Sequence, residues 1–129
     1  MRDLAVVVLG HGSRATKPEA NDAIEELGRM VGDLLDLPTA VAFLNRDSGR
    51  KGMEEACHEA VRQGQSTLVI LPLFLAGGVH VTEDIPAMVQ EVEASLGCRC
   101  LVARPIGADR GLAKVIVERA REVIQGEGL

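Results

Sequence analysis

The chain has 129 residues, 47% of them hydrophobic, and a formal net charge of −5 at pH 7. This length predicts one domain, residues 1–129, and the acidic balance argues against nucleic acid as a general partner. No apolar run is long enough to span a membrane, and three cysteines form no paired disulfide framework, which favours a reducing compartment. We therefore expect a cytoplasmic protein that binds neither nucleic acid nor membranes.

Apolar runs alternate with amphipathic stretches along the chain. Residues 4–10 predict a strand that is buried on both faces. Residues 20–35 predict a helix with Thr16 as its N-cap and with an apolar stripe: Ala20, Ala23, Ile24, Leu27, Met30, Val31, Leu34 and Leu35. Residues 40–44 predict a short second strand. The next helix carries an apolar stripe between residues 53 and 61 and is expected to end at Gly64.

The second half of the chain begins with its most apolar stretch, residues 68–76, which predicts a third strand followed by a glycine-rich exit loop. A third helix is expected to begin at about Thr82 or Asp84 and to stop at Gly97. Residues 98–103 predict a fourth strand. The last helix is expected after Asp109, with these apolar residues facing inward: Leu112, Val115, Ile116, Ala120, Val123 and Ile124.

Four repeats of a strand followed by a helix predict an α/β fold, in which a doubly wound, four-stranded parallel sheet has helices on both faces. The expected strand order is 2-1-3-4, so the chain changes direction between the first and third strands. The loops at the carboxyl ends of those strands then flank a crevice, which is where open α/β sheets bind ligands. His11 and His80 follow these two strands, so we expect them to converge there.

Two histidines at such a crevice can ligate a divalent metal, or divide the roles of metal ligand and base. Imidazole suits cobalt, nickel, iron, copper and zinc, and it transfers protons near neutral pH. Two ligands hold a metal weakly, because stable zinc sites use four. The open positions favour an enzyme that passes its metal on. The alternative, that each histidine only caps a loop or satisfies a backbone carbonyl, stays open.

Cys98 and Cys100 stand two residues apart in the fourth predicted strand, so both thiols are expected on one face of the sheet. They are candidates for a metal site or, more simply, buried strand cysteines. The sequence Gly10-x-Gly12 is too short for a dinucleotide-binding motif, and no phosphate-binding P-loop is present.

Three segments resemble the sirohydrochlorin metallochelatases, in particular the short CbiX type: VVVLGHGSR (6–14), VAFLN (41–45) and ILPLFLAGGVHVTEDIP (70–86). The resemblance covers nearly the whole chain and implies a chelatase-like fold. It also implies insertion of Co²⁺ into sirohydrochlorin on the anaerobic route to cobalamin, with the metal as a substrate and no tightly bound cofactor. Longer chelatases hold two such domains, so the resemblance implies that a half-length chain works as a homodimer.

The resemblance also implies roles for individual residues. His11 would be a metal ligand and the proton acceptor, and His80 the second ligand, which makes both catalytic. The macrocycle would lie against residues where glycines let the backbone approach a flat ligand: Leu75, Ala76, Gly77, Gly78 and Val79. Further substrate contacts are expected from the loops after the first two strands: Ser13, Arg14, Asn45, Arg46 and Ser48. Four cations on or just after these loops are candidates for binding the substrate's carboxylates, namely Arg14, Arg46, Arg50 and Lys51. The alternative, that they are only solvated loop charges, stays open.

Many members of this family carry a glutamate where this chain has Asn45. A carrier that binds a tetrapyrrole or metal without catalysis is therefore the alternative from another functional class. Within the same class, the alternative is insertion of nickel or iron. The fold alone also admits a flavodoxin-like binding or signalling domain, although the paired histidines and the lack of a phosphate-binding motif count against it.

Overall fold

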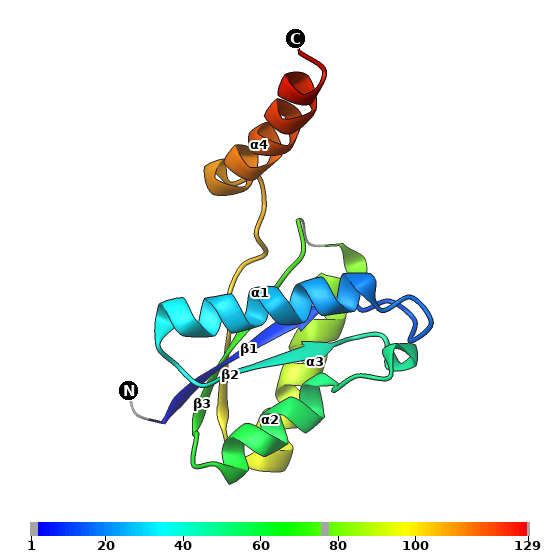
Figure 1. Cartoon of the computed structure of the whole chain (residues 1–129). Coiled ribbons are helices and arrows are strands. Elements are labelled where there is room, and N and C mark those ends of the chain that lie inside the picture. The colour runs from blue at the N-terminus through cyan, green and yellow to red at the C-terminus, as the bar shows by residue number, and fades with distance from the viewer. Residues whose placement is uncertain (1–2, 76–77, 129) are drawn as a thin grey trace.

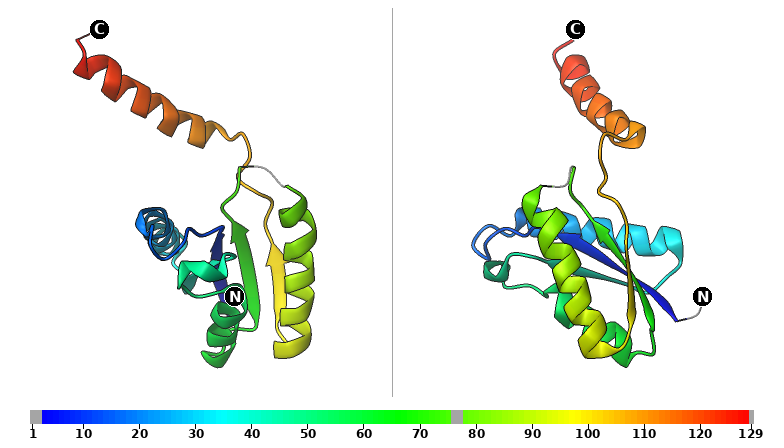
Figure 2. Two further views of the ribbon diagram at one scale, coloured as in Figure 1. Left: turned by 90° about the vertical axis from the view of Figure 1, so that its right-hand side faces the viewer. Right: turned by 180° about the vertical axis from the view of Figure 1, so that it is seen from behind.

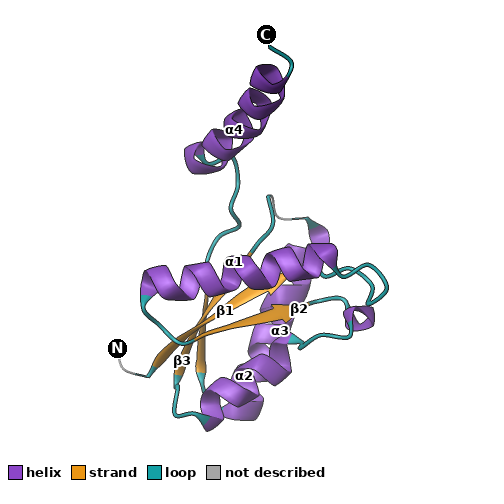
Figure 3. Cartoon of the chain, in the orientation of Figure 1, coloured by secondary structure: helices purple, strands orange, loops and turns teal. Residues whose placement is uncertain are grey.

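The computed structural model of the chain describes residues 3–75 and 78–128, without the side chains of residues 79–82. The four strands form one parallel sheet in the order β2-β1-β3-β4, which confirms the predicted topology (Figures 1 and 3). The elements in chain order are β1 (Leu4–Gly10), α1 (Glu19–Leu35), β2 (Thr39–Phe43), the 3-10 turn η1 (Arg46–Ser48), α2 (Met53–Arg62), β3 (Thr67–Pro72), α3 (Val79–Leu96), β4 (Arg99–Val102) and α4 (Arg110–Gly126).

The core lies on the face of the sheet that α2 and α3 cover. Alternate strand residues such as Val7, Leu9 and Ile70 meet Met53 of α2 and Ile85 of α3 in one buried cluster. β1 is buried from residue 5 to residue 10, as predicted for a central strand covered on both faces. This burial fixes the carboxyl end of β1, and with it the start of the loop that carries His11.

Helix α1 covers the opposite face, over β1 and β2. Gly28 brings the helix backbone close to the sheet, since a Cβ atom at this position would lie 2.2 Å from Cγ2 of Val41. Packing this tight holds α1 in one place over β2. The helix begins at Glu19 with Pro18 as its N-cap, so the prediction that Thr16 caps it is wrong. The amide of Lys17 donates instead to the carbonyl of Arg14 in a turn (2.8 Å), which places the helix start after the proline.

Helix α3 begins earlier than predicted. Its N-cap is Gly78, whose backbone is extended (φ −94°, ψ −177°), and its first residue is Val79. Thr82 and Asp84, whose side chains suit an N-cap position, lie inside the helix instead. His80 is therefore part of the first turn of α3, where we had expected a loop.

Helix α4 departs most from prediction, because it stands away from the rest of the molecule (Figure 2). Its apolar residues were expected to face inward, yet Ile116 is 61% exposed and no residue of the helix is buried. The cause lies in the connection 103–109, which is hydrogen-bonded to the end of β3 and to the chain that follows it. The amide of Ala103 donates to the carbonyl of Ile70, and that of Ile106 to the carbonyl of Phe74, both at 2.9 Å. These bonds carry the chain past the edge of the sheet before the helix begins.

The apolar stripe of α1 is also only partly buried. Ile24 and Val31 are half-buried toward the sheet, whereas Leu27, Met30 and Leu34 are exposed. The structure thus leaves apolar surface uncovered on both α1 and α4. Within residues 3–75 and 78–128, no helix is long and apolar enough to cross a membrane.

Candidate active site at the carboxyl edge of the sheet

His11 directly follows β1 at the carboxyl edge of the sheet, and its side chain is exposed. Its ring meets that of Phe74, two residues beyond β3, in an edge-on contact with 5.3 Å between centroids and 75° between planes. This contact joins the exit loops of β1 and β3. The prediction that these two loops are neighbours, which rested on strand order alone, is confirmed for the described residues.

The loop that carries His11 is held by a buried amide. Asn21 of α1 is 1% exposed, and its Oδ1 accepts from the amide of Ser13 (2.7 Å) while its Nδ2 donates to the Ser13 carbonyl (2.9 Å). Gly12 allows the turn, because its φ of +93° favours glycine and a Cβ would lie 3.1 Å from Cβ of Phe43. Sequence reasoning missed Asn21, although a polar residue within the apolar stripe of α1 was a usable signal.

Asn45 ties the exit loops of β1 and β2 together. Its amide donates to the carbonyl of His11 (2.8 Å), and its Nδ2 donates to the carbonyl of Gly12 (3.2 Å). Its Oδ1 accepts from the amide of Asp47 (2.9 Å) and so caps the turn η1. The Asn45 side chain therefore already has structural partners. A glutamate here could not donate to the Gly12 carbonyl, because an ionised carboxylate only accepts.

The four predicted cations near the site fall into two groups. Arg50 pairs with Asp22 and Glu25 of α1, and its hydrogen bond with Asp22 raises the pKa of the guanidinium. Lys51 pairs with Glu59 of α2, which lowers the pKa of that carboxyl. Their carboxylate partners make both poor candidates for binding substrate. Arg14 and Arg46 are exposed and have no ion pair among the described residues, so they stay available for an anionic ligand.

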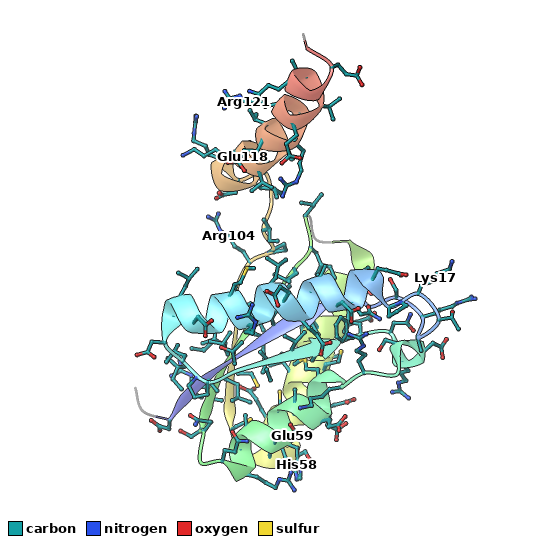
Figure 4. The ribbon with its side chains drawn as sticks, viewed as in Figure 1. Lys17, His58, Glu59, Arg104, Glu118 and Arg121 are labelled. Atoms are coloured by element: carbon teal, nitrogen blue, oxygen red, sulfur yellow. The ribbon has the colours of Figure 1, made fainter. Side chains whose placement is uncertain are left out.

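A further cation, Arg104, was not predicted. It lies on the connection after β4 (Figure 4) and lines a shallow hollow that also includes Leu75. Its side chain is exposed, with no ion pair within residues 3–75 and 78–128. The signal available in the sequence was its position, because it follows the fourth predicted strand as Arg14 follows the first.

The remaining predicted contacts differ in how far the structure bears on them. Ser48 is buried and its Oγ accepts from the amide of Arg50 (3.1 Å), so it supports the loop and offers a ligand no surface. Ser13 is half-buried, while Leu75 and Gly78 are exposed beside the site. A Cβ at Gly78 would meet no described atom within 4 Å, so packing does not require a glycine there.

Part of the predicted site lies outside the described residues. This applies to Ala76 and Gly77 as a whole, and to the side chains of Val79 and His80. The convergence of His11 and His80 therefore stays a prediction. Among the side chains that are described, no group of three or more His, Cys, Asp or Glu residues could hold a metal ion.

The strand cysteines give no support to a metal site of their own. Cys98 and Cys100 are buried in the core together with Cys57, on the single face that strand alternation predicted. Burial raises the pKa of the Cys98 thiol to about 11. Burial thus disfavours the thiolate, which is the form that binds metals.

Comparison with known proteins matches this chain to one family. The model of the CbiX family matches residues 5–123. The sirohydrochlorin cobaltochelatase of Methanopyrus kandleri is 27% identical, over 96% of this chain and 99% of its own length. The sirohydrochlorin ferrochelatase of Priestia megaterium is 32% identical over 92% of this chain, which spans only 44% of that protein.

A solved structure agrees with this assignment. The crystal structure of a cobalamin biosynthesis CbiX protein from Marinobacter aquaeolei superimposes with a TM-score of 0.80 at 26% identity, over 95% of this chain and 98% of its own. The shared fold therefore includes all four strands and the site at their carboxyl edge. The family match extends over nearly every element described above, and the chain belongs to the CbiX family.

Proposed function

We propose that this protein is a sirohydrochlorin cobaltochelatase, a lyase that inserts Co²⁺ into sirohydrochlorin in cobalamin biosynthesis. The observation that carries the proposal is an exposed imidazole, His11, held at the sheet's switch point in a chain that the CbiX family matches from residue 5 to residue 123. The relative from Methanopyrus kandleri that bears this name covers 96% of the chain.

His11 has the two properties that insertion requires. A neutral imidazole can ligate Co²⁺ through its free nitrogen. Insertion then displaces two pyrrole N–H protons as the macrocycle takes over coordination. The released imidazole can accept one of them, and the other passes to the substrate's own carboxylates or to water. The bonds from Asn21 and Asn45 to Ser13 and Gly12 hold the backbone of the loop that carries the ring. His80, in the first turn of α3, is proposed as the second ligand.

Binding an anionic macrocycle requires local cations, since the protein carries a net charge of −5. Arg14, Arg46 and Arg104 are exposed without carboxylate partners among the described residues. Guanidinium groups bind carboxylates in a bidentate manner, so we propose that these three orient the substrate's acid side chains. Gly78 and its neighbours would let the backbone lie against the flat ring.

We also propose an oligomeric state and a cellular location for the protein. We propose a homodimer, because the chain spans 44% of the longer ferrochelatase of Priestia megaterium and thus supplies about half of such a framework. A cytoplasmic location fits three cysteines that are all free. Histidine ligands favour nickel over cobalt on general affinity grounds, so metal choice in the cell would depend on supply.

The test is anaerobic incubation of the protein with sirohydrochlorin and Co²⁺, followed by absorbance. We expect the spectrum of the metallated product to form faster than without protein. Parallel reactions with Ni²⁺ and Fe²⁺ decide the metal. Tight binding of sirohydrochlorin without metallation by any of the three metals would contradict the proposal and favour a carrier.

A further inference from the structure

The exit loop of β2 (residues 44–52) is bound to the exit loop of β1 by backbone groups. The amide of Asn45 donates to the carbonyl of His11 (2.8 Å), and the amide of Ala15 donates to the carbonyl of Asp47 (2.9 Å). Neither bond requires a particular side chain, so both persist in a variant such as Asn45→Ala. The position of His11 therefore depends on what holds the exit loop of β2.

One side chain, that of Arg50, attaches this loop to α1. Its Nη2 lies 2.8 Å from Oδ1 of Asp22, and its Nη1 pairs with Glu25, one turn further along the helix. In the part of the chain that the structure describes, these are the only hydrogen bonds between residues 44–52 and α1. The Arg50 side chain is 22% exposed. The guanidinium is thus bound by two carboxylates and half-buried, which leaves it little surface for a ligand.

The backbone around Arg50 is itself fixed. The amide of Arg50 donates to Oγ of the buried Ser48 (3.1 Å), and the carbonyl of Lys51 accepts from the amide of Phe43 (2.9 Å). Gly49, with a φ of +71°, makes the turn before Arg50 in a conformation that favours glycine. The two ion pairs therefore restrain the loop as a whole and not merely one side chain.

Helix α1 binds the two exit loops at neighbouring residues. Asn21 binds the exit loop of β1 at Ser13, and Asp22, the next residue, binds the exit loop of β2 through Arg50. Because the two loops also bind one another, the three segments form a closed ring in which each is held from two sides. Loss of the Arg50 side chain opens this ring at the exit loop of β2.

We infer that Arg50 is a positioning residue for His11: it holds the exit loop of β2 against α1 and so fixes the loop that carries the imidazole. This role rests on the proposed chelatase function, and it differs from binding the substrate's carboxylates. A single exposed ion pair contributes little, whereas one guanidinium bound by two carboxylates is restrained in direction as well as in distance. A displacement of about 1 Å can cost about 10²-fold in rate, so a small shift of the loop is sufficient.

The first test opens the ring from each side in turn. Arg50→Gln, and Asp22→Asn combined with Glu25→Gln, should each lower kcat for cobalt insertion by about 10- to 100-fold without lowering KM for sirohydrochlorin. If Arg50 bound the substrate instead, the double variant would free its guanidinium and lower KM. That result, or a wild-type kcat for Arg50→Gln, would overturn the proposal.

Two further variants serve as controls for charge and for the stability of α1. Arg50→Lys keeps the charge but loses the planar fork that reaches two carboxylates, so it should restore only part of kcat. Arg29→Gln is the matched control, because Arg29 also pairs with two carboxylates, Glu26 and Asp33, but both belong to α1 itself. Its kcat should equal that of wild type, and an equal loss in Arg29→Gln and Arg50→Gln would contradict a role specific to Arg50.

The second test needs no substrate and is therefore independent of the chelatase function. Hydrogen exchange of single backbone amides is measured by nuclear magnetic resonance on the protein alone. In Arg50→Gln the amides of Ala15 and Asn45 should exchange faster, because their acceptors belong to the opposite loop. The amide of Val7, inside the sheet, should be unchanged and shows that the fold is intact.

Unchanged exchange at Ala15 and Asn45 would overturn the proposal, whatever the activity. Faster exchange there, together with a wild type that inserts no metal, would support the restraint by Arg50 and contradict only the chelatase function.

Discussion

The two halves of the sheet consist of similar strands but differ in how far helices cover them. Around β1 and β2, helices cover both faces, and Asn21 and Asn45 bind the exit loops to one another and to α1. Around β3 and β4, α3 covers one face, whereas the described residues leave the other face partly open: Leu101 is exposed there while α4 stands apart (Figure 2). The closed half holds His11 in one position. The open half leaves apolar surface exposed, so the half that carries His11 is also the more completely packed part of the sheet.

The largest effect that distinguishes the halves is expected from His11→Ala. A positioned general base contributes about 10²–10⁴-fold to rate, so cobalt insertion should fall by at least that range, because the ligand is lost with the base. Folding and dimer mass should not change, since the side chain is exposed. His58→Ala, on α2 far from the site (Figure 4), is the matched histidine control. An insertion rate within a few-fold of wild type would remove His11 from the mechanism.

A pair of leucine truncations compares the two halves by stability. Leu9 is fully buried in the closed half, so Leu9→Ala should lower the free energy of unfolding by about 2–5 kcal/mol. Leu101→Ala should cost little in the separated chain. If the proposed homodimer covers this residue, the cost should grow with protein concentration. Urea unfolding at two widely separated protein concentrations measures the cost of both truncations. A cost for Leu101→Ala that does not change with protein concentration would mean that this face stays exposed.

Because α1 packs closely on β2, we expect Gly28→Ala to lower the free energy of unfolding. The added Cβ would fall 2.2 Å from Cγ2 of Val41, and overpacking of this kind costs about 1–3 kcal/mol. Gly126→Ala in α4 is the control, since a Cβ there would meet no described atom within 4 Å. Alanine is the better helix former, so the control should unfold at the same or a slightly higher urea concentration. Equal behaviour of the two variants would show that α1 does not pack as closely as described.

The smallest effect is expected at Asn45. Asn45→Ala removes the cap of η1 and the bond to the Gly12 carbonyl, which should cost about 0.5–2 kcal/mol. It should mainly weaken binding of sirohydrochlorin, measured by titration, and leave turnover present. Wild type that binds without metallating, together with active Asn45→Glu, would instead show that a carboxylate at this position is essential to insertion.

The sequence predicted the features that depend on periodicity and missed those that depend on individual contacts. The strands, their order and the position of His11 follow from apolar runs and from the geometry of parallel sheets. The role of Asn21 follows from hydrogen bonds to Ser13, eight residues away, for which no periodic pattern exists. Thr16 has the chemistry of a cap, but Pro18 moved the helix start beyond it.

The sequence could not predict the position of α4, for a different reason. An amphipathic stripe indicates that a helix buries one face, but it does not specify which molecule supplies the partner. The same holds for Leu27 and Leu34 on α1, which periodicity assigned to the core and the structure leaves exposed. Only the backbone bonds of the connection at Ala103 and Ile106 explain why the helix stands away from the sheet.

The edge-on contact between His11 and Phe74 also makes the site observable by magnetic resonance. The ring current of Phe74 acts on the imidazole protons of His11 across 5.3 Å. The chain has no Trp or Tyr and only two Phe residues, so few other rings can disturb that signal. Any movement of the exit loop of β3 relative to that of β1 changes the ring-current shift. The imidazole proton resonances therefore report, in the protein without substrate, whether a substitution such as Asn45→Ala shifts the two loops relative to one another.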